Sequence, residues 1–141
     1  MAIPVERYGF EDVPAWFQAR GVRMAIGDVV DATNSDSMSV GFARYAKGAA
    51  NEWTAVYDEA LVITKGVFTV DSATGARTAR AGEVIFLRRG SHVVYRAEED
   101  TEWVYVTYPN WMEATQRSEV AAQLDAYHQI SAPEAEGVVA R

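Results

Sequence analysis

Residues 52–66 read EWTAVYDEALVITKG, and this stretch decides the fold because it holds two short apolar strands and ends on a glycine. A matching stretch, GEVIFLRRGSHVVY, occupies residues 82–95 and again places a strand, a glycine-containing turn and a second strand in succession. Between them, residues 67–80 read VFTVDSATGARTAR, which predicts a β-hairpin with Gly75 late in its turn. Short apolar runs separated by glycine turns favour an antiparallel sheet that closes on itself.

Further strands are predicted on both sides of this centre. Residues 22–26 alternate apolar and other side chains, residues 38–45 repeat the pattern, and residues 102–108 form an aromatic strand that Pro109 ends. With only short helices expected at the termini, the sequence predicts an all-β, single-domain antiparallel barrel or sandwich.

The two ends of the chain are expected to lie outside this barrel. Residues 1–20 are predicted to form an arm and a short helix over Phe10–Arg20, and the barrel is expected to span residues 21–110. Residues 111–141 are predicted to form a second helix, with Asn110 as its cap, and then a mobile tail from Ser131 onward.

Composition limits the classes of function. The chain has 141 residues, of which 49% are hydrophobic, and this suits one domain with one sizeable core. No cysteine is present, so neither a disulfide nor a thiolate metal site is expected. A net charge of −7 argues against nucleic acid and anionic membrane as partners. Neither a secretion signal nor an apolar run of membrane-spanning length is found, so a cytoplasmic protein is expected.

The central stretches carry a partial motif of the cupin superfamily. Glu59 and Gly66 match its first pattern, while Glu52 and Thr54 stand where two histidines are usual. Gly82 and Gly90 match its second pattern, but Arg88 and Val93 replace the usual proline and histidine. The chain therefore resembles a cupin in which Glu59 alone fills an expected metal-ligand position. The resemblance implies the cupin barrel, a double-stranded β-helix or jelly roll.

One branch of the superfamily is more similar still, namely the EutQ cupins of ethanolamine utilisation. The runs that carry this resemblance extend over residues 21–111 and are Gly27–Val30, Met38, Gly41–Phe42, Trp53–Thr54, Tyr57–Glu59, Gly82–Phe86, Gly90–Ser91 and Val106–Trp111. It implies a metal-independent cupin whose histidines are replaced, an acetate kinase activity, and pairing into a homodimer through the sheets.

Glu59 is the leading candidate for catalysis. Alternation along its strand would place it, Leu61 and Ile63 on the inner face, in the lumen of the barrel. A lone carboxylate among apolar walls has a raised pKa and can donate or accept a proton near neutral pH. The alternative is a structural carboxylate that accepts a hydrogen bond from a tyrosine hydroxyl.

Metal binding is the competing interpretation. If Glu52 faced the lumen, it and Glu59 would form a carboxylate pair, and an inward His92 would complete a three-ligand site for a divalent ion. Alternation along the strand, however, places His92 on one face and Val93 and Tyr95 on the other, so a β-bulge would be needed to turn His92 inward. Glu52 could equally be a solvated glutamate.

Other residues are predicted to orient a ligand. Tyr57 is expected to assist Glu59, and the expected ligand-binding residues are Tyr45, Glu52, Thr54, Tyr95, Tyr105 and Arg44. No phosphate-binding Gly-rich loop and no Gly-x-Ser-x-Gly elbow occur, so the residues themselves support neither nucleotide binding nor a common hydrolase. The leading hypothesis is a cofactor-free cupin that binds a small polar molecule and performs acid–base chemistry. The alternatives are a metal-dependent oxygenase or isomerase, and a non-catalytic dimeric binding or assembly module.

Overall fold

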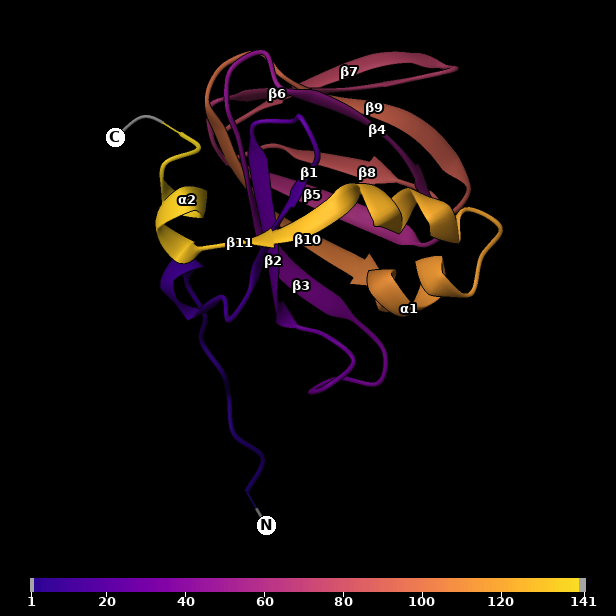
Figure 1. The fold of residues 1–141 in the computed structure, drawn as a ribbon. Helices are drawn as coiled ribbons and strands as arrows, with labels where there is room; N and C mark the ends of the chain where they lie inside the picture. The colour runs from indigo at the N-terminus through magenta and orange to yellow at the C-terminus, as the bar shows by residue number, and fades with distance from the viewer. Residues whose placement is uncertain (1, 140–141) are drawn as a thin grey trace.

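A computed structural model describes residues 2–139, and its strands form two antiparallel sheets that face each other. The larger sheet has the strand order β11-β1-β2-β3-β10-β5-β8 and the smaller has the order β4-β9-β6-β7 (Figure 1). The bounds of the strands are β1 Trp16–Ala19, β2 Met24–Val30, β3 Ser39–Tyr45, β4 Ala50–Ala55, β5 Asp58–Lys65, β6 Val67–Ser72, β7 Gly75–Arg80, β8 Val84–Leu87, β9 Ser91–Ala97, β10 Thr101–Tyr108 and β11 Tyr127–Ile130. The predicted all-β antiparallel fold is confirmed.

The chain crosses from one sheet to the other at Gly66, between β5 and β6. Gly66 has a φ of 86°, a conformation that residues with a Cβ rarely adopt, and an added Cβ would overlap the carbonyl oxygen of Asp100. Glycine is therefore required here both by the backbone conformation and by the close approach of the β9–β10 turn.

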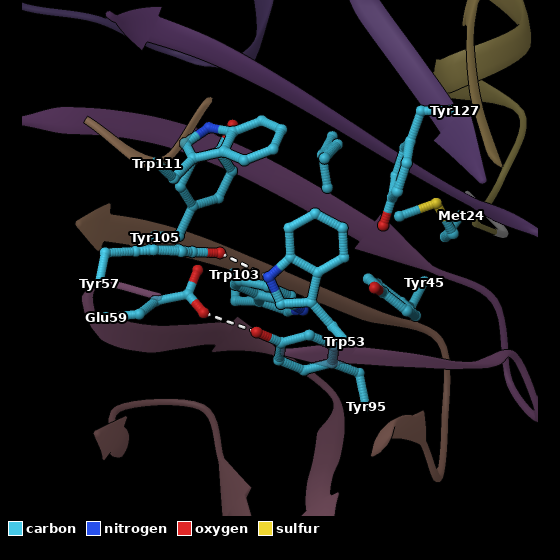
Figure 2. A pocket seen from close by; sticks show the side chains of 11 residues that line it. Met24, Tyr45, Trp53, Tyr57, Glu59, Tyr95, Trp103, Tyr105, Trp111 and Tyr127 are labelled. Atoms are coloured by element: carbon cyan, nitrogen blue, oxygen red, sulfur yellow. Dashed lines mark hydrogen bonds between the residues drawn. The ribbon is translucent and has the colours of Figure 1, made fainter. Parts of the chain in front are cut away.

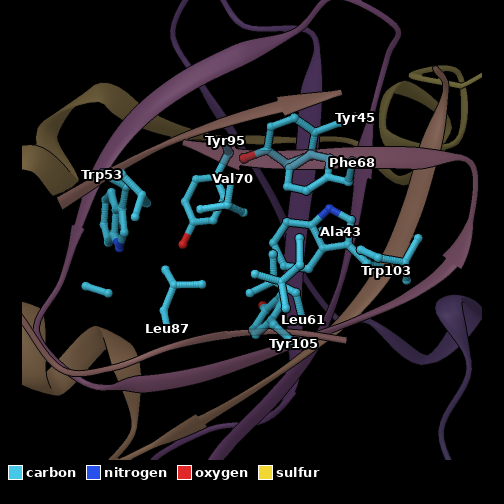
Figure 3. Packing of buried hydrophobic residues seen from close by; sticks show 14 of the residues in the cluster. Ala43, Tyr45, Trp53, Leu61, Phe68, Val70, Leu87, Tyr95, Trp103 and Tyr105 are labelled. Carbon is cyan, nitrogen blue, oxygen red and sulfur yellow. The ribbon is translucent and has the colours of Figure 1, made fainter. Parts of the chain in front are cut away.

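The core fills the space between the sheets with side chains that alternate along each strand. On β5, Glu59, Leu61 and Ile63 are buried while Ala60 and Val62 are only half-buried, as the period of two requires. Aromatic rings make up much of this core, and Phe68 lies 5.0 Å from Tyr45 and 5.3 Å from Trp103 between ring centroids (Figure 3).

The N-terminal segment differs from its prediction. Phe10–Arg20 is not a helix; it contains the single 3-10 turn η1, Phe10–Asp12, and then strand β1. Strand β1 pairs with β11, which lies more than a hundred residues later in the chain. The strand forms because β11 and β2 flank it on both sides, and no local pattern announces such a long-range pairing.

The C-terminal segment also differs. The predicted helix is the short α1, Trp111–Gln116, followed by the 3-10 helix η2, Ala121–Ala126, and Asn110 donates to the carbonyl of Met38 instead of capping α1. From Ser131, predicted to be mobile, the chain forms α2, Ala132–Glu136, which Ser131 caps. Val138 and Val139 are buried after it, while residues 140 and 141 lie outside the described residues. No helix within residues 2–139 is long and apolar enough to cross a membrane.

Candidate functional site

A cavity of about 40 Å³ lies between the sheets and is lined almost entirely by rings (Figure 2). Its lining residues are Met24, Ile26, Tyr45, Trp53, Tyr57, Glu59, Tyr95, Trp103, Tyr105, Trp111 and Tyr127. Glu59 is the one carboxylic acid among these lining residues, and the others are tyrosines, tryptophans, Met24 and Ile26. The cavity is thus an aromatic chamber with a single acid.

Glu59 is at the start of β5 and points into this cavity. Its side chain is buried, and Tyr95 on β9 donates a hydrogen bond of 2.6 Å to Oε1 (Figure 2). Oε2 has no hydrogen-bond partner among the described residues. Burial disfavours the ionised form and raises the pKa of Glu59 from its usual 4.5 to about 7, although the bond from Tyr95 opposes this effect.

The predicted tyrosines all line the cavity. Tyr57 accepts a 2.7 Å hydrogen bond from Trp53 Nε1 (Figure 2). Tyr45 donates to Asn51 Oδ1 at 2.5 Å. Tyr105 donates its hydroxyl hydrogen to Asp28. Burial raises the pKa of Tyr45, Tyr57, Tyr95 and Tyr105 well above the usual 10, so their hydroxyls stay protonated at neutral pH. The geometry suits a role in ligand binding, and that role stays a prediction.

Glu52 and Thr54 do not face the lumen, which corrects their prediction as ligand-binding residues, and His92 lies outside it as alternation along its strand predicts. They lie on the outer face of β4 and β9, where His92 Nε2 is 2.6 Å from Glu52 Oε2 and His92 Nδ1 is 2.7 Å from Thr54 Oγ1. The inward residue of β4 is Trp53, and an offset of one residue along a strand moves a side chain to the opposite face.

Consequently the proposed carboxylate pair and three-ligand metal site do not form. Glu59 is inside the barrel, while Glu52 and His92 are exposed on its surface. Within residues 2–139 no group of three or more His, Cys, Asp and Glu side chains is arranged to hold a metal ion.

Arg44 also lies outside the lumen, contrary to its prediction as a ligand-binding residue. It neighbours the inward Tyr45 on β3, so its side chain emerges on the outer face of the sheet. There Arg44 Nε is 2.9 Å from Glu102 Oε2, and the guanidinium lies 4.4 Å from the ring centroid of Phe10. The segment before β1 therefore buries Arg44 as a structural ion pair.

Asp28 is a half-buried acid that the sequence reasoning missed as a site residue. It accepts hydrogen bonds from Tyr105 and from Trp111 Nε1, the latter at 3.0 Å, and burial raises its pKa from 3.8 to about 6. It lines a second cavity of about 260 Å³ that shares Tyr105 and Trp111 with the lumen. The signal was available, because Met24, Ile26 and Asp28 follow the same alternation on β2.

Trp103 carries the one buried side-chain polar atom that lacks a hydrogen-bond partner in the described part of the chain, its Nε1. The ring stands among other rings, with Tyr45 at 5.9 Å and Phe68 at 5.3 Å between centroids. Its indole N–H is therefore enclosed by aromatic neighbours, where a weak contact with a ring face is the available compensation.

Comparison with known proteins agrees with this architecture. The sequence model of the family described as ethanolamine utilisation protein EutQ matches residues 19–113. The chain is 29% identical over 89 residues to a protein of Escherichia coli K12 named acetate kinase EutQ, covering 62% of this chain but only 38% of that protein. The matched region is thus well under half of that relative.

Solved structures give the same result. The EutQ protein of Clostridium difficile is 26% identical, with a TM-score of 0.61 and coverage of 69% of each chain. A Cupin_2 domain of a transcriptional regulator from Enterobacter cloacae shares the fold alone, at 17% identity and a TM-score of 0.52 over 60% of this chain and 95% of that domain. The chain belongs to the EutQ family of ethanolamine utilisation proteins and has the cupin fold.

Proposed function

We propose that this cupin binds a small polar molecule in its lumen without a metal ion and exchanges a proton with it through Glu59. The observation that carries the proposal is a buried carboxyl group with Oε1 bonded to Tyr95 and Oε2 without a hydrogen bond at the wall of a cavity. Buried acids without a basic partner are uncommon in protein interiors, because desolvation is costly.

The pKa of Glu59 supports an acid–base role. At a pKa of about 7 the protonated and ionised forms are both populated at neutral pH, so the group can act as a donor or as an acceptor. Tyr57 and Tyr95 flank the carboxyl group and would orient the ligand.

The cavity restricts the size of the ligand. One water-sized position takes roughly 10–15 Å³ of such space, so about 40 Å³ corresponds to a ligand of roughly three non-hydrogen atoms. At about −1.5 kcal/mol per atom at best, such a ligand binds with a Kd no tighter than about 0.5 mM. Millimolar concentrations are therefore required in any assay.

Phosphoryl transfer finds less support in this cavity. The name acetate kinase belongs to relatives of which this chain covers only 38%. No lysine or arginine lines the lumen, whereas phosphate groups are held by cationic side chains or by rows of backbone N–H groups. We therefore place proton transfer ahead of phosphoryl transfer for this domain.

The test compares Glu59→Gln with the matched surface variant Glu52→Gln. A panel of neutral, cationic and anionic molecules of two to four non-hydrogen atoms, about the size that the cavity admits, is titrated while tryptophan fluorescence is recorded. Three of the four tryptophans line the cavity, so occupancy should change the emission. We expect at least one compound to bind in a manner that Glu59→Gln abolishes and Glu52→Gln preserves. No binding by any compound, or equal binding by both variants, contradicts the proposal.

Metal independence is tested on the same preparations. Elemental analysis of the purified protein should find iron, manganese, nickel and zinc well below one equivalent, and the binding should survive treatment with a chelator. A stoichiometric metal that is lost together with ligand binding would support the metal-dependent alternative.

A second candidate function, a homodimeric assembly module without catalysis, is favoured by an exposed apolar surface. Val84 and Phe86 on the edge strand β8 are 57% and 52% exposed, and they pair across the ladder with Val62 and Ala60 of β5. Surfaces of this kind often mark contacts with another protein. We propose a second copy of the chain as the occupant, since Ile3 and Val5 on the projecting N-terminal arm are also exposed (Figure 1).

Analytical ultracentrifugation tests this second candidate by measuring whether the protein is a dimer or a monomer in solution. Phe86→Asp should shift a dimer toward monomers, whereas Ala76→Asp on the exposed edge strand β7 should leave it unchanged. A protein that is monomeric before any substitution contradicts the homodimer.

A further inference from the structure

We propose that the ligand of the lumen is a small organic ammonium ion, held by Glu59 as its counter-charge and by the rings of Trp53, Trp111 and Tyr127. The inference rests on the proposed function, because it assigns a chemical class to the ligand of the same cavity. It goes beyond that function by predicting the charge of the ligand.

The charge balance of the lumen favours a cation. Glu59 takes part in none of the ion pairs formed by residues 2–139, and no lysine, arginine or histidine lines the cavity. A buried carboxylate is normally paired, and otherwise it remains protonated. A ligand that carries a positive charge supplies the missing partner, whereas an anion would add a second uncompensated charge.

The ring arrangement favours an ammonium ion over a bare metal ion. The ring of Trp53 lies 5.9 Å from that of Trp111 at 71° and 5.7 Å from that of Tyr127 at 85°, so the three rings form steep walls (Figure 2). The negative face of an aromatic ring attracts alkylammonium ions, and tryptophan does so most strongly. A metal ion would instead need several converging oxygen or nitrogen ligands, and one carboxylate is too few.

The lumen rings carry no cation of the protein itself. The cation–ring contacts within the described residues join Arg44 to Phe10 and Trp16, and Arg88 to Phe86. None of these five residues lines the lumen. No cation of the described residues therefore competes with a bound ligand for the lumen rings.

Binding of the cation is linked to a proton at Glu59. Below a pH of about 7 the carboxyl group is mostly protonated, and an alkylammonium ion must displace that proton into solvent before it can pair with the carboxylate. Affinity should therefore fall by about tenfold between one pH unit above and one below this pKa. The other titratable groups that face Glu59 are Tyr45, Tyr57, Tyr95, Tyr105 with its partner Asp28, and Tyr127. The tyrosines do not titrate in this range, and Asp28 titrates nearer to 6.

The experiment uses three compounds with about three non-hydrogen atoms each, the size set by the cavity. Ethylammonium chloride is the cation, ethanol the neutral molecule and sodium formate the anion, and sodium chloride controls for ionic strength. Each is titrated into the full chain while tryptophan fluorescence is followed. We expect saturable binding of ethylammonium alone, about tenfold weaker at the lower pH, lost in Glu59→Gln and retained with its pH dependence in the surface variant Glu52→Gln.

The outcomes separate this inference from the proposed function. If ethanol or formate binds and ethylammonium does not, and the binding requires Glu59, the proposed function stands and the cationic ligand is wrong. If none of the compounds gives saturable binding, both fall. Ethylammonium binding that persists in Glu59→Gln also overturns the inference, provided that circular dichroism shows the variant to be folded.

A ring substitution distinguishes a cage from simple charge attraction. Tyr127→Leu removes one wall and leaves Glu59 and Tyr95 in place, so ethylammonium affinity should fall several-fold. Unchanged affinity in this variant would remove the rings from the proposed recognition.

Discussion

The raised pKa of Glu59 predicts that the protein loses stability as the pH rises, and that Glu59→Gln removes the loss. Because the pKa is about 7 in the folded chain and 4.5 in the unfolded one, the folded chain holds more protons between these values. Unfolding therefore becomes easier as the pH rises from 4.5 toward 7, and above that pH the difference stays constant. Below 4.5 both states are protonated and no loss remains.

The magnitude follows from the two pKa values. Their difference corresponds to about 3 kcal/mol at 1.36 kcal/mol per pH unit, a large part of the stability of a small domain. Glutamine stays neutral and its Oε1 can still accept from Tyr95, so the variant lacks this dependence. Titration of Asp28 also lowers the stability of the protein as the pH rises, but Asp28 is present in both proteins, so its effect cancels in the comparison.

Urea unfolding in a series of buffers from about pH 4 to pH 9, which brackets the usual and raised pKa values, provides the measurement. We expect the unfolding free energy of Glu59→Gln minus that of the unsubstituted protein to grow by about 3 kcal/mol across this window and then level off. Glu52→Gln, which changes an exposed acid, should follow the unsubstituted protein. Parallel curves for Glu59→Gln and the unsubstituted protein would show that Glu59 titrates normally, and would refute the reasoning.

Three further predictions concern other positions in the sheets and turns. Asp28→Asn should remove a smaller loss of stability between pH 3.8 and about 6, seen as a flatter dependence of the urea midpoint on pH; an unchanged slope would contradict the assigned pKa. Leu61→Ala should cost about 2–5 kcal/mol in urea unfolding because Leu61 is fully buried, and a cost below 1 kcal/mol would mean that the core is loosely packed. Gly66→Ala should be much more destabilising than Gly82→Ala in thermal unfolding, since both have positive φ but only the Cβ at position 66 would overlap Asp100; equal effects would contradict this contact.

The position of Glu59 was readable from the sequence, because alternation along a strand is a local property. The same rule correctly placed Leu61 and Ile63 inside and separated His92 from Val93 and Tyr95. Glu52 and Thr54 occupy the histidine positions of the cupin pattern only by spacing from Glu59 across the turn before β5, and spacing across a turn does not fix which face of the preceding strand a residue occupies. The buried Trp53 does fix it, because alternation on either side of Trp53 turns Glu52 and Thr54 outward.

The sequence by itself determined the antiparallel sheets, their glycine turns and the inward acid, since each depends on residues near one another in the chain. Only the tertiary structure decided that Trp16–Ala19 is a strand, because its partner Tyr127–Ile130 lies at the other end of the chain. It also decided that Arg44 is buried beneath the N-terminal segment and that Tyr105 and Trp111 close around Asp28. These contacts depend on how distant segments pack together, and no local period in a sequence encodes that packing.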